Sequence, residues 1–136
     1  MHILLTRPID DCSEMIVKFR SLDHKVSHLP LINVEKVQHE EINPNDYGGL
    51  IFTSSNAVRN LNVENLNKKL ICFCVGSATE KKARSLGFQN TLAAEGNVSN
   101  LKELILQNYE LKDTPLLYVS GEIITTDLDQ QLLKDG

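Results

Sequence analysis

The chain has 136 residues, of which 41% are hydrophobic and 24% charged, so it can form one domain, or two small ones, with a substantial core. Its net charge of −4 argues against a nucleic-acid binder, which needs a basic surface. No apolar run approaches the ~20 residues of a membrane span, and the N-terminus "MHILLTRP" lacks the pattern of a signal peptide, so we expect a cytoplasmic protein without membrane contacts.

Short apolar runs alternate with helical patterns from one end of the chain to the other. We expect strands over 2–6, 49–53, 70–76, 90–94 and 115–121. We expect helices over 10–23, 54–66, 77–87, 97–109 and 122–136. The candidate helix caps are Ser54 or Ser55, Ser77 or Thr79, and Asn97 or Ser99, with Gly87 as a stop. This alternation predicts an α/β fold, a doubly wound parallel sheet of flavodoxin-like size.

The sequence predicts a boundary between two lobes early in the chain. The segment 29–45 carries Pro30, Pro44 and a mixed charged run, and it is too long for an ordinary turn. We expect it to cross between two lobes. The predicted division is a strand–helix–strand part at 1–34, a linker at 35–45 and a larger lobe at 46–136.

Metal and cofactor patterns are missing from the sequence. Cys72 and Cys74 lie two apart in one strand, so they share a face and are expected to be buried thiols. Cys12 has no obvious partner, and the four histidines show no metal-ligand spacing. Neither of the glycine-rich phosphate-binding motifs, G-x-G-x-x-G and G-x-x-x-x-G-K-[ST], is present. We therefore expect no metal and no cofactor, and a nucleotide is not the first ligand expected.

Small polar residues follow four of the predicted strands, in "LLTRP", "IFTSSNAV", "CVGSAT" and "YVSGE". Ligands of open parallel sheets bind beyond the carboxyl ends of the strands. Small residues let a ligand approach the backbone, and the free amides and dipole at a helix start favour an anion. Each turn alone is explained as an ordinary helix cap, but together they predict an anion-binding cleft. Hydroxyl donors would come from Thr53, Ser54, Ser55, Ser77, Thr79 and Ser120.

No nucleophilic or acid–base constellation stands out in the sequence. Asp10 and Asp11 adjoin Arg7, but they fall in the first turn of a helix, where acids usually serve as dipole partners. An enzyme built this way would act mainly by holding a reactive substrate in shape.

The segments "ILLTRP", "LIFTSSNAV", "CVGSATEKKARSLGF", "AAEGNVSNL" and "LLYVSGE" resemble, in order and spacing, the uroporphyrinogen-III synthase family. The resemblance implies a cytoplasmic monomer with two flavodoxin-like lobes joined by extended linkers. It implies an enzyme of haem (tetrapyrrole) biosynthesis, a lyase that closes the linear tetrapyrrole hydroxymethylbilane into uroporphyrinogen III. That reaction inverts ring D and loses water, without cofactor or metal. The substrate-binding positions it suggests are Thr6, Arg7, Thr53, Ser54, Ser55, Asn56, Gly76, Ser77, Ala78, Thr79, Ser120 and Gly121.

The chain also departs from the family pattern. Family members are much longer, so the last strand of the larger lobe and most of the first lobe are not expected in this chain. Tyr47, Tyr109 and Tyr118 do not match the family's tyrosine thought to help the hydroxyl leave, so no catalytic residue is assigned. We therefore expect the 136-residue chain alone to be inactive, and a strand-swapped dimer is one way for it to cover its unfinished lobe.

Two other kinds of protein fit the same pattern. A non-catalytic flavodoxin-like or receiver-like anion-binding module is the alternative function, although no Asp ends the strand at 49–53 as a receiver needs and "TRPIDD" has too little Gly for a flavin phosphate loop. A non-catalytic relative of the synthases, which keeps a lobe without the reaction, is the other.

Overall fold

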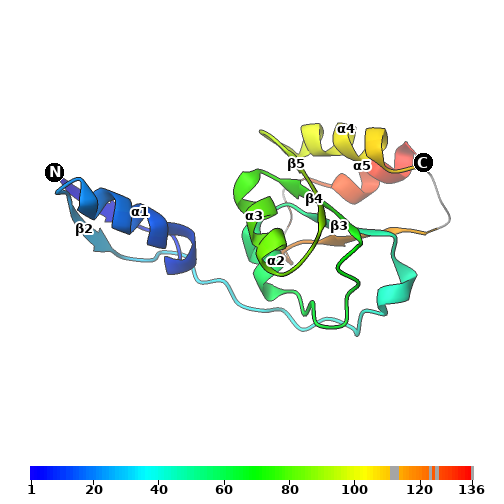
Figure 1. Cartoon of the computed structure of the whole chain (residues 1–136), viewed down its shortest axis with the longest axis horizontal. Coiled ribbons are helices and arrows are strands. Elements are labelled where there is room, and N and C mark those ends of the chain that lie inside the picture. Colours follow the sequence, from blue (N-terminus) through cyan, green and yellow to red (C-terminus); the bar gives the residue numbers. More distant parts are fainter. Residues whose placement is uncertain (111–113, 123, 125, 136) are drawn as a thin grey trace. The chain divides into compact units, whose positions relative to one another are not determined.

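The computed structural model describes residues 1–110, 114–122, 124 and 126–135. By their internal contacts, the residues form two compact units, Met1–Lys36 (unit 1) and Val37–Gly136 (unit 2) (Figure 1). Each unit is described by itself.

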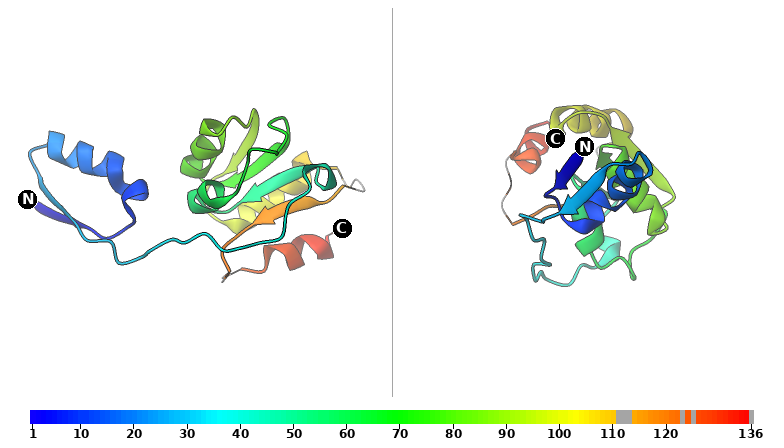
Figure 2. Two further views of the ribbon diagram at one scale, coloured as in Figure 1. Left: turned by 90° about the horizontal axis from the view of Figure 1, so that it is seen from below. Right: turned by 90° about the vertical axis from the view of Figure 1, so that its left-hand side faces the viewer.

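Unit 1 is a single strand–helix–strand motif. Strand β1 (His2–Leu5) pairs in parallel with β2 (Lys25–His28), and helix α1 (Ile9–Ser21) connects them. Figure 2 shows α1 lying along the two strands. The buried hydrophobic side chains of this unit are Cys12 and Ile16, both on α1. A motif of this size therefore has a very small core.

Unit 2 is a parallel sheet with helices on both faces. Its four strands lie in the order β5-β4-β3-β6. Their bounds are Gly49–Phe52 (β3), Ile71–Val75 (β4), Asn90–Ala94 (β5) and Leu116–Val119 (β6). The short 3-10 helix η1 covers Pro44–Asp46, and the α-helices are Ser55–Asn60 (α2), Ser77–Ser85 (α3), Val98–Asn108 (α4) and Leu128–Lys134 (α5). The predicted α/β fold with a parallel sheet is confirmed.

The core of unit 2 has two layers, one on each face of the sheet. Successive side chains of a strand point to opposite faces, so Leu50 and Phe52 join the cluster with α2 and α3, while Ile51 joins the cluster with α4 and α5. Figure 1 shows these two helix pairs on opposite sides of the strands. All four residues of β3 are buried, as the continuous apolar run "GLIF" predicts for a central strand.

Two predicted helices differ from the structure. Helix α2 ends at Asn60 and not at 66, because asparagine side chains offer the backbone other partners. Asn62 Oδ1 accepts from the amide of Glu64 at 3.2 Å, and Asn67 Oδ1 accepts from the amide of Lys69 at 3.0 Å. Helix α5 begins at Leu128 and not at 122. The β-branched run at 123–126 disfavours a helix, although 123, 125 and the predicted last residue, 136, lie outside the described residues.

Candidate functional site

The four parallel strands of unit 2 end at the same edge of their sheet, and the chain reverses its direction across the sheet at β3. From β3 the chain moves through β4 to β5, then returns to place β6 on the other side of β3. In open α/β sheets, ligands bind outside the carboxyl ends of the strands at a reversal of this kind. Phe52 of β3 is in register with Val119 of β6. Thr53 and Ser120, the residues that follow, therefore occupy equivalent positions at this switch point.

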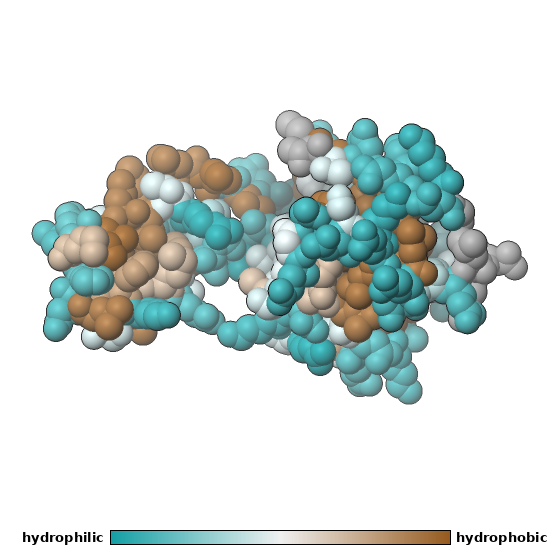
Figure 3. All heavy atoms as spheres, turned by 90° about the horizontal axis from the view of Figure 1, so that it is seen from above, coloured by the Kyte–Doolittle hydropathy of each residue, from teal (hydrophilic) through white to brown (hydrophobic). Residues whose placement is uncertain are grey.

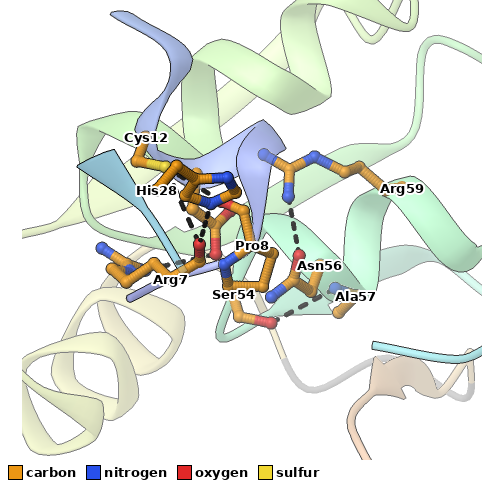
Figure 4. Close-up of polar contacts among 9 residues, drawn as sticks. Arg7, Pro8, Cys12, His28, Ser54, Asn56, Ala57 and Arg59 are labelled. Carbon is orange, nitrogen blue, oxygen red and sulfur yellow. Dashed lines mark hydrogen bonds and ion pairs between the residues drawn. The ribbon is translucent and has the colours of Figure 1, made fainter. Parts of the chain in front are cut away.

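The turn after β3 is fixed by a serine cap and by an arginine. Ser54 Oγ accepts from the amide of Ala57 at 3.2 Å, so Ser54, rather than Ser55, caps α2. Arg59 donates from a terminal guanidinium nitrogen to Asn56 Oδ1 at 2.6 Å (Figure 4). This contact uses the oxygen of the Asn56 amide and leaves its amino group as the donor of that side chain.

The turn after β4 brings a bare backbone to the same edge. Gly76, rather than Ser77 or Thr79, lies at the start of α3, with φ of 77°. A Cβ placed on Gly76 would meet no atom within 4 Å, so there is open space beside its backbone. Ser77 and Ala78 are exposed, whereas Thr79 is only 4% exposed and faces the interior of unit 2.

The turn after β6 completes this edge. Ser120 and Gly121 are exposed, and Ser120 Oγ donates to the Gly121 carbonyl at 3.1 Å. The structure thus brings the unit 2 candidates to one edge of one sheet, with Thr79 turned inward. Whether these residues bind a ligand stays a prediction.

In unit 1 the remaining candidates, Thr6 and Arg7, follow the carboxyl end of β1. The Arg7 guanidinium contacts the Asp11 carboxylate at 3.4 Å. His28 Nε2 lies 2.8 Å from the Arg7 carbonyl oxygen (Figure 4). Cys12 Sγ donates to the Pro8 carbonyl at 3.4 Å. The turn between β1 and α1 is therefore held by side chains of α1 and by His28 of β2.

Sequence reasoning did not name three of these residues as functional: Arg59, His28 and Asp11. An Asn and an Arg three positions apart on a helix are neighbours, so the sequence "NAVR" could have indicated that Arg59 contacts Asn56. His28 gave no such signal, because its contact with Arg7 depends on the pairing of β1 with β2. Asp11 was noticed, but as a dipole partner.

The groups with shifted pKa values do not suggest covalent chemistry. Burial raises the pKa of the Cys72 and Cys74 thiols to about 12, so both stay protonated and unreactive at neutral pH. Hydrogen bonds from Thr91 and Arg84 lower the pKa of Glu80, and burial raises the pKa of Tyr109. Within the part of the chain that the structure describes, no three His, Cys, Asp or Glu side chains gather as a metal site requires.

An open parallel sheet covered by helices on both faces, with small polar turns at its switch point, places the chain among the doubly wound α/β proteins. A family model described as Uroporphyrinogen-III synthase HemD matches residues 13–136, and the chain belongs to this family. No curated protein matches the sequence closely enough to be named as a relative. Among the described residues, no helix is long and apolar enough to cross a membrane.

Proposed function

We propose that the chain acts in the uroporphyrinogen-III synthase reaction, the closure of hydroxymethylbilane to uroporphyrinogen III with inversion of ring D and loss of water. The family match over residues 13–136 carries this proposal. The strand ends at the β3–β6 switch point, with their exposed donors, support it as the place where substrate binds.

The chemistry of the substrate fits such a site. Hydroxymethylbilane carries acetate and propionate groups on every ring, so it is a polyanion. A chain with net charge −4 cannot attract it through its overall field and must use local donors. In unit 2, the turns after β3, β4 and β6 offer hydroxyls and backbone amides, and Arg59 adds positive charge. In unit 1, Arg7 offers an exposed guanidinium. The proposed substrate-binding residues are those of the sequence prediction other than Thr79, which is only 4% exposed, with Arg59 added.

Positioning is the main catalytic contribution that we propose. Hydroxymethylbilane loses its hydroxyl readily and closes by itself to the type I isomer. The enzyme must fold the chain so that the substituted carbon of ring D attacks, after which a spiro intermediate reopens and recloses. Holding the reacting atoms together can supply much of the rate, and donors placed where charge develops can supply more. No residue is assigned to protonate the leaving hydroxyl.

The exposed hydrophobic side chains of unit 1 affect whether the 136-residue chain can fold and act alone. Most of the large hydrophobic side chains that are exposed in the described residues belong to it (Figure 3). They are Met1, Leu4, Ile9, Met15, Val17, Leu22, Leu29, Leu31, Ile32 and Val34. Leaving such side chains in water forgoes ~1.5–3 kcal/mol each. We infer that unit 1 is part of a lobe that needs further surface to fold stably, and that a strand-swapped dimer is one source of it.

An isomer assay with freshly made hydroxymethylbilane tests the proposal. The 136-residue chain alone is expected to give mainly the type I product, as buffer does. Joined to the remainder of a family member, which would complete the lobe of unit 1, it is expected to give type III. Failure of the joined protein to exceed the type III yield of buffer contradicts the proposed function, and favours a non-catalytic anion-binding module.

A further inference from the structure

We propose that Asp11 and His28 are positioning residues that hold Arg7 ready for a substrate carboxylate. The inference rests on the proposed function, because it takes Arg7 as a ligand-binding residue. It concerns unit 1 alone, where the three residues come from the β1–α1 turn, from α1 and from the end of β2.

Among the described residues, the guanidinium of Arg7 contacts one side chain, that of Asp11. Its terminal nitrogen lies 3.4 Å from Asp11 Oδ2. The Asp11 side chain is 5% exposed and so has little freedom, whereas the Arg7 side chain is 68% exposed. A guanidinium has five N–H donors in a planar fork. One long contact to Asp11 therefore orients the fork and leaves most of its donors for a bidentate bond to a carboxylate.

The backbone of Arg7 is held at the other end of the residue. His28 Nε2 lies 2.8 Å from the Arg7 carbonyl oxygen. Because a carbonyl oxygen only accepts, Nε2 must carry the hydrogen of this bond. The backbone pairing also continues past the strands, since the amide of Leu31 donates to the Thr6 carbonyl at 2.9 Å. The Cα of Arg7 is thus fixed, and Asp11 limits where its side chain can reach.

Such restraint matters for a long side chain that binds an anion. An arginine that moves freely must lose its rotamer freedom when it binds, and ordering one such side chain costs about 0.5–1.5 kcal/mol. A side chain ordered in advance avoids most of that loss. We therefore expect loss of the Asp11 contact to weaken ligand binding by about two- to tenfold, the fold-change to which that cost corresponds.

If Asp11 does not position Arg7, the expected change in anion affinity has the opposite sign. Asp11 is negatively charged, and so is the ligand. If Asp11 is only a dipole partner of α1, then its replacement by the neutral, isosteric Asn removes a repulsion and tightens anion binding. Exposed ion pairs often contribute little of their own. The direction of the effect of Asp11→Asn on affinity therefore separates positioning from a general field effect.

The experiment measures fluorescence titrations of the joined protein of the isomer assay, in which the lobe of unit 1 is completed, with uroporphyrin III, the stable oxidised form of the proposed product. Asp11→Asn is expected to weaken binding by about two- to tenfold. The matched control is Asp10→Asn, which removes the same charge one position earlier, at an exposed residue, and is expected to leave affinity unchanged or to raise it. In an Arg7→Met background, Asp11→Asn is expected to have no weakening effect.

The role of His28 is tested by a conservative rescue. His28→Leu removes the donor to the Arg7 carbonyl and is expected to weaken binding, whereas His28→Gln keeps an N–H donor and is expected to restore much of it. Circular dichroism confirms that each variant retains the secondary structure of the parent chain.

The outcomes separate this inference from the proposed function. Tighter or unchanged binding by Asp11→Asn, or equal effects of Asp11→Asn and Asp10→Asn, overturns the positioning role whatever the isomer assay shows. Absence of binding by the unaltered joined protein overturns it as well. Binding that depends on Arg7 and Asp11, in a protein that fails the isomer assay, supports the positioning role and contradicts only the proposed reaction.

Discussion

Replacing Gly76 by Ala tests the bare turn at the carboxyl end of β4. At φ of 77° and ψ of 154°, this residue occupies a region open essentially only to glycine. Because a Cβ there would meet no atom within 4 Å, the cost of the substitution is conformational and not steric. Strain of this kind costs about 1–3 kcal/mol. For a unit of about 100 residues each kcal/mol lowers Tm by about 4–8 °C, so thermal unfolding should show a loss of several degrees.

The same substitution should weaken uroporphyrin binding if a ligand approaches this backbone. The added methyl group would occupy the open space, and we expect it to reduce affinity more than Ser55→Ala, which removes one hydroxyl worth about 0.5–1.5 kcal/mol. The control is Gly49→Ala at the other end of the sheet, where a Cβ would lie 2.8 Å from the Ile71 carbonyl oxygen. It should destabilise the fold while its folded fraction binds normally. A Gly76→Ala protein that binds as tightly as the parent would refute the close approach.

Two further substitutions and one thiol-labelling experiment test the local interactions. Ser54→Ala removes the cap of α2 and should lower the free energy of unfolding by about 1 kcal/mol in denaturant titrations; no change would mean that the cap contributes nothing. Thr91→Val removes the hydroxyl that donates to the Glu80 carboxylate and lowers its pKa. This hydrogen bond stabilises the fold fully above pH 4.5, the ordinary pKa of glutamate, and the stabilisation is lost as the pH falls through the lowered pKa. The Thr91→Val deficit, about 1 kcal/mol at neutral pH, should therefore shrink in acid, and a deficit that grew instead would contradict this sign. Buried thiols with a pKa of about 12 should not react with a disulfide reagent at pH 8 until the chain unfolds, so prompt labelling of Cys72 or Cys74 would show that the burial is wrong.

Much of the fold could be predicted from the sequence because local patterns determine it. The apolar run at 70–76 and the short strand at 90–94 were placed within a residue of β4 and β5. Asn97 caps α4, with Oδ1 accepting from two amides of the first turn, and Gly87 follows α3 with φ of 95°. These features depend on a few neighbouring residues, which is why propensity and capping rules found them.

Other features depend on competition or on distant pairing. Asparagine turns replace the helical pattern after α2, so apolar spacing alone extended the predicted helix too far. The position of β6 beside β3, which creates the switch point, follows from packing between segments far apart in sequence. The inward turn of Thr79 likewise depends on which face of α3 meets the sheet. The hydrogen bond between Arg59 and Asn56 depends on where α2 ends and on the rotamers of both side chains.

In the proposed function, the carboxyl ends of β3, β4 and β6 bind a carboxylate-bearing tetrapyrrole. The most direct test is nuclear magnetic resonance of the ¹⁵N-labelled chain during titration with uroporphyrin III. We expect amide shifts concentrated at Thr53–Asn56, at Gly76 and Ser77, and at Ser120 and Gly121. Shifts concentrated at the opposite ends of the strands, near Gly48 and Asn90, or no shifts at saturating ligand, would contradict it.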